Sequence, residues 1–568
     1  MATYNNLKPV EAPKFIEDFR QMLRTSAERF GDKALYNYKV NGELCSISYT
    51  EFYENVRAFS TALTLKGLAG KTIAVTGDTH PAWTAAFYSV MITGGIIVPL
   101  DHELDAAQMA EFMKISKCCA VVYTSAMEPK IEEILPKADF LEYYISADCR
   151  LDSDKCIEFD EMIKLGKDAV ENGDTSFEDA VIDLDKVSAI LFTSGTTGSS
   201  KGVMLSQGNI VASANASCLS TQYGPDDVFV SVLPIHHTYE LTTGQIAATN
   251  LGCTTYVCEG IRYASRCFKE YKPTSLILVP LFLETVHKKI WAEIKRKGIE
   301  KKVRAGMAIS DQLLKLGIDN REKLFGEITG AFGGRLKSIV VGGAPIDPQI
   351  IRDFYSFGIS VFQGYGITEC SPLVSVNRPG KVKFETIGQP VDFCEVKIAP
   401  MAESENGEGE ILVRGANVMK GYYENEEATR AAFTDDGWFR TGDIGKMDKK
   451  GYITITGRLK NVIIASNGKN VFPEELEERL NRITAVRECV VIGRDGDDGE
   501  TVITAVIVPD YDVLGEGTSD TAASLILKEA IAQINRTLPA YKHINRFEIR
   551  HEDFEKTLTK KIKRFLVK

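Results

Sequence analysis

The apolar positions of the chain follow two different periods, which predict helices in some stretches and strands in others. Residues 14–31 carry apolar side chains three to four positions apart, whereas residues 72–76, 95–99 and 119–123 are short, largely apolar runs. The first spacing predicts an amphipathic helix, and the short runs predict buried strands. Strands that alternate with helices are typical of a parallel sheet covered by helices. The chain is therefore predicted to have an α/β fold.

A compact strand–helix–strand unit is predicted over residues 338–362. Residues 338–341 and 359–362 are apolar runs of strand length, and Asp347 and Pro348 between them suit the N-cap and first position of a helix. A glycine-rich segment follows each strand. Because ligands bind beyond the carboxyl ends of strands in open α/β sheets, these two segments are predicted to border a ligand site.

The pattern changes after residue 385, where short strands separated by turns replace the long alternation of strands and helices. A chain of 568 residues is also too long for one core. We expect a large N-terminal domain, residues 1–456, with sheets flanked by helices and a β-rich part at about 385–456. A small, mobile α+β domain is expected at 457–568, with a hinge near Lys460.

Composition narrows the class of protein. There are 67 Lys and Arg residues against 78 Asp and Glu, a net charge of −11, which disfavours nonspecific binding to nucleic acid. The 12 cysteines form no Cys-x-x-Cys pair, and with seven histidines no structural zinc site is expected. Free thiols indicate a reducing compartment, so we expect a cytoplasmic protein. No apolar run has the length of a bilayer span, and peripheral membrane contact stays open.

The segment with the clearest chemistry is residues 193–202, which follows an apolar run at 187–192. It contains hydroxyl side chains, two spaced glycines and Lys201. Glycines let backbone N–H groups approach an anion, and hydroxyls add further donors, so the segment is predicted to bind phosphate. It lacks the Gly-Lys-Ser/Thr ending of the Walker loop, which argues against an ordinary P-loop NTPase.

Four more segments complete a set that occurs in a fixed order along the chain. They are residues 364–369, directly after the strand predicted to end at Phe362, and residues 438–443, 457–460 and 554–564. With the phosphate loop, this set resembles the adenylate-forming superfamily of acyl-CoA synthetases, peptide-synthetase adenylation domains and firefly luciferase. The resemblance covers almost the whole chain, and residues 457–478 look most like long-chain fatty acid–CoA ligases.

The resemblance implies a two-step reaction that uses ATP, Mg²⁺ and coenzyme A. A fatty acid, expected to have a long chain, would first form acyl-AMP with release of pyrophosphate, and a thiol would then displace AMP. Both reactants of the first step are anions, so the site must supply positive charge and fixed donors. Lys561 would stabilise the transition state, Glu369 and Thr193 would hold Mg²⁺, and Thr368 would donate to phosphate. The resemblance also implies that the phosphates are bound by the residues of the phosphate loop, which are Thr193, Ser194, Gly195, Thr196, Thr197, Gly198 and Lys201.

The same resemblance implies which residues bind the nucleoside and the acyl acceptor. Tyr365 would stack on adenine, and Asp443 would accept hydrogen bonds from the ribose hydroxyls. In the second step the small domain would turn about Lys460 and present the face at 466–469 to the pantetheine arm. The remaining residues with implied roles are Gly343, Ala344 and Gly366 around adenine, Arg458 beside Asp443, Ser466 and Gly468 toward CoA, and His237 beside the carboxylate channel.

Two positions depart from the family pattern. Ser200 stands where proline usually precedes the loop lysine, and Lys560 stands where glycine usually precedes the catalytic lysine. Adjacent lysines leave open whether Lys560 or Lys561 is catalytic.

Two alternatives also remain open: a stand-alone enzyme that loads an acyl or aryl acid onto a carrier protein, and a nonenzymatic member of the fold. The absence of an acidic residue suited to an ammonium group near residues 233–240 favours an apolar acid over an amino acid.

Overall fold

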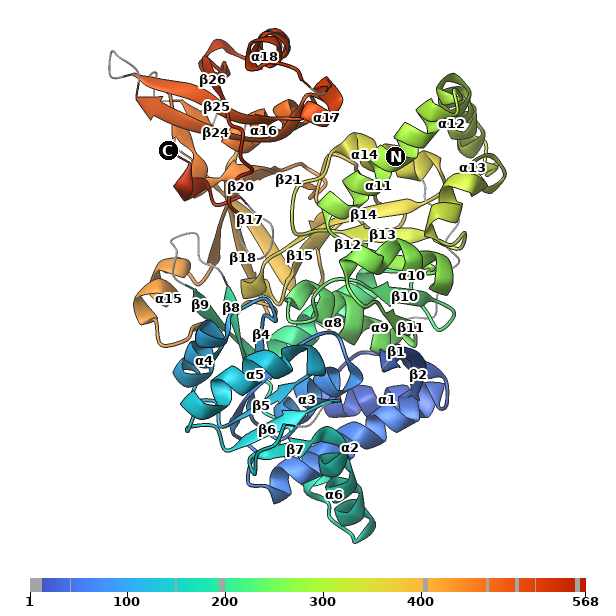
Figure 1. Ribbon diagram of the computed structural model, residues 1–568, viewed down its shortest axis with the longest axis vertical. Helices are drawn as coiled ribbons and strands as arrows, with labels where there is room; N and C mark the ends of the chain where they lie inside the picture. Colours follow the sequence, from blue (N-terminus) through green and yellow to red (C-terminus); the bar gives the residue numbers. More distant parts are fainter. Residues whose placement is uncertain are drawn as a thin grey trace. The chain divides into compact units, whose positions relative to one another are not determined.

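The computed structural model describes residues 13–40, 42–148, 151–193, 200–401, 407–465, 469–495, 500–515, 517–556 and 562–567. They form two compact units (Figure 1). The first unit comprises residues up to 395 together with 414–431, and the second comprises 396–413 and the residues from 432 onward. Together they confirm the predicted α/β class.

One sheet of the first unit is mainly parallel. Its eight strands, in spatial order, are β19 (Gly421–Tyr422), β9 (Lys201–Ser206), β8 (Val187–Thr193), β4 (Ile96–Leu100), β3 (Thr72–Thr76), β5 (Ala120–Tyr123), β6 (Tyr143–Ser146) and β7 (Cys156–Glu158). The strands from β8 to β7 pair in parallel, and β9 and β19 add an antiparallel edge. The strands predicted near 72–76, 95–99, 119–123 and 187–192 are confirmed.

The second sheet of this unit has nine strands. In spatial order they are β16 (Gln389–Pro390), β15 (Leu373–Val376), β14 (Ser360–Gly366), β13 (Ser338–Val341), β12 (Ser275–Leu278), β10 (Val228–Ser231), β11 (Thr254–Val257), β1 (Ala34–Val40) and β2 (Glu43–Ser48). Strands β14, β13, β12, β10, β11 and β1 pair in parallel, so their carboxyl ends share one edge.

The predicted strand–helix–strand unit is confirmed, with one correction. Asp347 caps helix α14 (Pro348–Ser356) by accepting from the Gln349 amide at 2.8 Å. Strand β14, however, does not end at Phe362 but continues to Gly366. The strand is longer because β15 pairs antiparallel with this end of β14, which places Tyr365 opposite Ser375. The segment expected to be a loop is therefore largely strand.

Helix α8 (Gln207–Ser220) lies between the two sheets. It contacts β8 and β9 of one sheet and β15 of the other, and twelve of its 14 residues are buried. Helix α3 (Pro81–Ile92) is buried at all 12 positions, as expected of a helix enclosed on every side. The other helices of the unit are α1 (Phe19–Phe30), α2 (Tyr49–Leu65), α4 (Ala106–Ile115), α5 (Glu128–Ile134), α6 (Phe159–Glu171), α7 (Ser176–Asp179), α9 (Ala247–Leu251), α10 (Ala264–Tyr271), α11 (Pro280–Arg296), α12 (Glu300–Lys315), α13 (Arg321–Thr329) and α15 (Glu426–Ala432).

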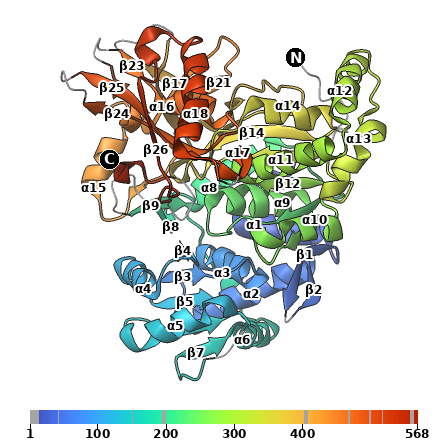
Figure 2. The same cartoon turned by 45° about the horizontal axis from the view of Figure 1, so that its top comes forward.

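The second unit contains short sheets, as the change of pattern after residue 385 predicts (Figure 2). The four strands β17 (Cys394–Pro400), β18 (Gly409–Gly415), β20 (Phe439–Met447) and β21 (Ile453–Arg458) form one sheet, and β24 (Val486–Asp495), β25 (Thr501–Pro509) and β26 (Arg546–Ile549) form another. The strand pair β22 (Ile463–Ile464) and β23 (Asn470–Val471) and the helices α16 (Pro473–Asn481), α17 (Tyr511–Leu514) and α18 (Asp520–Asn535) complete it. The boundary at 456/457 and the hinge near Lys460 stay predictions.

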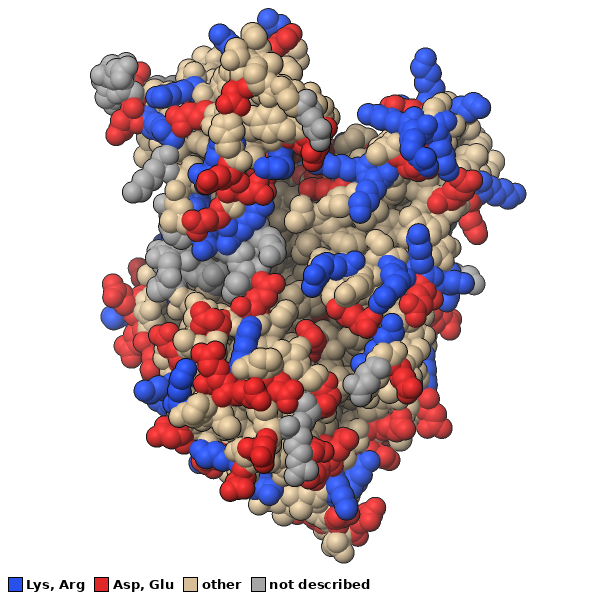
Figure 3. All heavy atoms as spheres, viewed as in Figure 1, with Lys and Arg blue, Asp and Glu red and all other residues tan. Residues whose placement is uncertain are grey.

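Positive charge is concentrated on helices α11–α13, where Lys and Arg gather in Figure 3. Residues 280–337 hold thirteen Lys and Arg against seven Asp and Glu, a net charge of +6 within a chain of net charge −11. Ile309, Leu316 and Ile318 on or beside α12 are exposed. Across the part of the chain that the structure describes, none of the helices combines the length and apolar character needed to cross a bilayer. Peripheral membrane contact stays a prediction.

The contact between α2 and α6 depends on a glycine. A Cβ atom added to Gly166 of α6 would lie 1.8 Å from the carbonyl oxygen of Ala58 in α2. We expect Gly166→Ala to separate the helices and to lower the free energy of unfolding by about 1–3 kcal/mol. Gly326→Ala in α13 is the control, because its Cβ would meet no atom within 4 Å, and it should stabilise by about 0.5–1 kcal/mol. Equal thermal unfolding of the two variants would contradict this packing.

A second prediction concerns Glu240, whose carboxyl is buried in the π-helical segment η3 (Tyr239–Ile246). Burial raises its pKa to about 7, although Ser231 Oγ donates to Oε1 at 2.6 Å and Gln245 Nε2 donates at 2.8 Å. The folded state thus holds a proton that the unfolded state releases near pH 4.5, so this contribution to stability falls as the pH rises from about 4.5 to 7.

We expect Glu240→Gln, which stays neutral, to match the wild type at pH 5 and to be more stable by about 1–3 kcal/mol at pH 8. Denaturation of both proteins across this range checks the prediction. A difference between them that does not change with pH would show that Glu240 is not the titrating group.

Candidate active site

A cavity of about 520 Å³ lies along the nine-stranded sheet in the first unit. Gly343 lines one end and Lys337 lines the other, and these residues flank strand β13. The cavity therefore extends along the whole strand, about 20 Å at a rise of ~3.3 Å per residue. Val340, Phe362 and Val376 contribute apolar side chains to its lining, and Thr243, Ser275 and Asn377 contribute polar ones.

The end of the cavity at the carboxyl edge of the sheet is formed by glycines and one tyrosine. Gly343, Tyr365 and Gly366 line it, whereas the neighbouring Ala344 does not, although Gly343 and Ala344 are both exposed. Gly343 has a φ of +86°, a conformation that favours glycine. A Cβ at Gly366 would lie 2.4 Å from the Pro372 carbonyl oxygen, so only glycine fits there without a backbone shift. The structure thus brings these three predicted residues together, and their role toward adenine stays a prediction.

Glu369 is held by a residue that the sequence did not single out. It lies in the short helix η6 (Thr368–Cys370), immediately after β14, and Thr368 is its neighbour. The Tyr422 hydroxyl donates to Glu369 Oε1 at 2.9 Å. Burial and the Glu369 carboxylate raise the pKa of Tyr422 above its ordinary value, so the hydroxyl stays protonated as a donor. The only sequence signal for this contact is the Gly421-Tyr422-Tyr423 run.

The same tyrosine connects Glu369 to the base of the phosphate loop. Lys201 Nζ lies 4.8 Å from the centre of the Tyr422 ring, a cation–π contact. Strand β19 pairs Tyr422 with Val203 of β9, and Thr193 of β8 pairs with Lys201. Lys201, Tyr422 and Glu369 therefore form one continuous cluster at the point where the phosphate loop leaves the sheet.

Several predicted residues lie outside the described residues. They are Ser194, Gly195, Thr196, Thr197 and Gly198 of the phosphate loop, Ser466 and Gly468 of the predicted CoA face, and Lys561. The predictions made for them stand as predictions.

His237 lies in the segment after β10, at the carboxyl edge of the nine-stranded sheet. It is half-buried, and its ring centre is 4.2 Å from that of His236. The described lining of the cavity includes Tyr239 and Thr243 of η3 rather than His237. Its proximity to the carboxylate channel is therefore still untested.

In the second unit, Asp443 and Arg458 are neighbours, as predicted. They are paired across strands β20 and β21, and Arg458 Nε lies 2.8 Å from Asp443 Oδ1. Asp443 is only 3% exposed. An ion pair of this kind fixes the carboxylate, which an acceptor of ribose hydroxyls requires.

Comparisons with known proteins agree with this arrangement. The family model of the AMP-binding enzyme matches residues 23–423, and that of the AMP-binding enzyme C-terminal domain matches residues 460–567. Long-chain-fatty-acid–CoA ligase FadD15 of Mycobacterium bovis is 26% identical over 94% of this chain and 92% of its own length. Long-chain-fatty-acid–[acyl-carrier-protein] ligase AEE15 of Arabidopsis thaliana is 26% identical over 89% of this chain and 78% of its length.

A solved structure shows the same fold. ATP-bound MatB from Rhodopseudomonas palustris superposes with a TM-score of 0.74 at 22% identity, and the match covers 96% of this chain and 98% of that one. Because the first family model alone spans well over half of the sequence, the family assignment does not depend on any single relative. The chain belongs to the AMP-binding enzyme family, within the adenylate-forming superfamily.

Proposed function

We propose that this protein activates a long-chain fatty acid with ATP and transfers the acyl group to coenzyme A. The observation that carries the proposal is the elongated cavity, which extends from the glycine–tyrosine end along β13 and has apolar walls where Val340, Phe362 and Val376 line it. An extended hydrocarbon chain gains free energy when it leaves water for such walls. The name of the FadD15 relative supports the same substrate class.

The first step joins two anions. A carboxylate oxygen attacks the α-phosphorus of ATP, the bond to the bridging oxygen breaks, and pyrophosphate leaves. Lys201 and Lys561 would supply positive charge near the phosphates and the incoming carboxylate. In the second step a CoA thiolate attacks the carbonyl carbon, and AMP leaves with the electron pair of the C–O bond.

The residues present fit a bound Mg²⁺. Glu369 offers a carboxylate, the ligand type that Mg²⁺ prefers, and Tyr422 holds one of its oxygens in place. Thr193 would add a hydroxyl at the base of the phosphate loop. The ion, when bound, neutralises charge on the phosphate oxygens.

The far end of the cavity bears on the choice of acid. Ser220, Gln222, Asp227 and Lys337 line it, so a chain that reaches this end meets polar groups. The comparison of substrates must therefore include plain acids of increasing length and an ω-hydroxy acid of each length.

The proposal is tested by pyrophosphate release and thioester formation with this panel. CoA and acyl-carrier protein are offered in parallel, because the name of the AEE15 relative supports a carrier-protein acceptor as the second candidate. We expect long-chain acids and CoA to give the highest kcat/KM. Higher kcat/KM with the carrier protein would favour the second candidate, and ATP binding without turnover on any acid would overturn both.

The proposal also places the enzyme in the cytoplasm. Eleven cysteines among the described residues are free thiols, which supports a reducing compartment.

Tyr422→Phe isolates the hydrogen bond to Glu369. The variant keeps the ring beneath Lys201 and removes only the hydroxyl, so one hydrogen bond to a charged group is lost. Such a bond contributes about 1.5–3 kcal/mol, and kcat/KM for ATP should fall about 10- to 100-fold. The control is Tyr423→Phe, whose neighbour is Lys117. Equal activity of the two variants would contradict the role of Tyr422.

Lys561→Ala should slow adenylation by about 10²–10³-fold, the effect of one lost electrostatic donor. It should largely spare thioester formation from supplied acyl-AMP, because the proposed hinge motion uses another face of the small domain for that step. Lys560→Ala is the matched control. If Lys560→Ala is the damaging change, the catalytic lysine is the preceding residue, and equal loss of both steps would argue against two conformations.

A further inference from the structure

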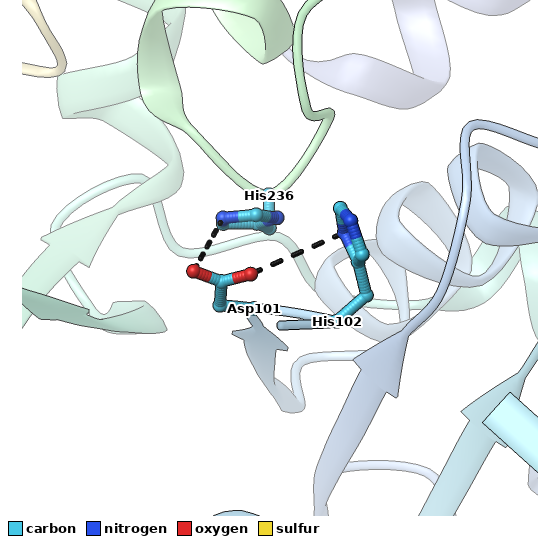
Figure 4. A group of neighbouring side chains, drawn as sticks. All are labelled: Asp101, His102 and His236. Carbon is cyan, nitrogen blue, oxygen red and sulfur yellow. Dashed lines mark ion pairs between the residues drawn. The ribbon is translucent and has the colours of Figure 1, made fainter. Parts of the chain in front are cut away.

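Two histidines and an aspartate meet outside the cavity described above (Figure 4). Asp101 and His102 directly follow strand β4 of the eight-stranded sheet, and His236 follows strand β10 of the nine-stranded sheet. One ligand atom of each side chain lies within 4.8 Å of those of the other two. The cluster therefore joins segments that are far apart in the sequence.

The histidine nitrogens of this cluster lack ordinary partners. His236 is 8% exposed, and within the described part of the chain neither of its ring nitrogens makes a hydrogen bond, nor does His102 Nδ1. His236 Nε2 lies 3.5 Å from Asp101 Oδ2, a distance that allows an ion pair but exceeds a well-formed hydrogen bond. Buried polar groups normally have hydrogen-bond or metal partners, so a bound ligand would explain these unpaired nitrogens.

We propose that Asp101, His102 and His236 form a binding site for a divalent transition-metal ion of the zinc type. Two imidazoles and a carboxylate are ligands that zinc accepts, whereas Mg²⁺ prefers oxygen ligands alone. Three protein ligands leave a position open for water or a small anion. This site shares no residue with the Mg²⁺ position proposed at Glu369 and Thr193.

The distances suit such an ion. Bonds of about 2.0–2.2 Å to a tetrahedral zinc ion place the ligand atoms roughly 3.4 Å apart. His236 Nε2 and Asp101 Oδ2 are already 3.5 Å apart, and His102 Nδ1 lies 4.0 Å from Asp101 Oδ1. The two distances involve different oxygens of Asp101, so the side chains must rotate to bring one ligand atom of each residue onto a shared ion.

The ion would connect the two sheets of the first unit. The carboxyl end of β4 and the segment after β10 belong to separate sheets. An ion that binds the folded chain and not the unfolded chain raises the temperature of unfolding. Metal binding and thermal stability are thus two readouts that require neither ATP nor an acid, so they remain informative if the proposed function fails.

The test uses the full chain, stripped of metal with a chelator and titrated with Zn²⁺, Co²⁺ and Mg²⁺ in the absence of nucleotide. The variants are His236→Ala, the more conservative His236→Gln, and His102→Ala. The matched control is His551→Ala, because His551 Nε2 lies 3.2 Å from Asp520 Oδ2 in an exposed pair that no third ligand completes among the described residues. Cobalt absorption in the visible range reports the coordination of the ion.

We expect one Zn²⁺ or Co²⁺ per chain in the wild type and in His551→Ala, no binding of Mg²⁺ at this site, and a metal-dependent rise in unfolding temperature. Loss of one ligand should weaken binding at least ~100-fold, the upper end of the cost of losing an outer-shell partner. Equal binding by the wild type and both His236 variants, or no binding by the wild type, would overturn the proposal and leave an Asp–His ion pair.

Discussion

Charge repulsion between two anions is the constraint on which the functional account depends. A carboxylate and a triphosphate approach each other only where fixed cations and donors replace the water around them. Under the proposed function, the first unit would supply such a place at the base of the phosphate loop. Lys201, Tyr422 and Glu369 form a connected cluster there, and the Tyr422 hydroxyl holds the carboxylate at 2.9 Å.

The parallel topology explains how residues from distant parts of the sequence serve one region. Strands β10, β12, β13 and β14 run in the same direction, so the segments that follow them lie at a common edge. Gly343 follows β13, Tyr365 ends β14, and both line the same cavity. Under the proposed function, the apolar side chains along the strands would direct an acyl chain away from this edge.

Local sequence patterns predicted the elements whose formation depends on neighbouring residues. The strand at 72–76 and the helix start at Asp347 and Pro348 need only apolar spacing and capping chemistry. The predicted end of β14 at Phe362 was wrong, because the extension of the strand to Gly366 depends on pairing with β15. The pairing of one strand with another cannot be predicted from the residues of either strand alone.

The same reason explains what sequence patterns missed in the sites. The contact of Tyr422 with Glu369 and the meeting of Asp101 with His236 join residues that only the folded chain brings together. The buried state of Glu240 likewise depends on the surrounding core rather than on its neighbours in sequence. By contrast, the ordered set of motifs was sufficient to indicate the family, which the matching family models confirm.

The central claim, attack of a carboxylate on the α-phosphorus, is tested most directly with a fatty acid labelled with ¹⁸O in its carboxylate. The acid is supplied with unlabelled ATP and CoA, and the ¹⁸O content of the products is measured by mass spectrometry. The account predicts that AMP gains one labelled oxygen and that pyrophosphate gains none, because the attacking oxygen stays on phosphorus when the thiol displaces AMP. Thioester formation with unlabelled AMP, and the label in phosphate or pyrophosphate instead, would contradict it.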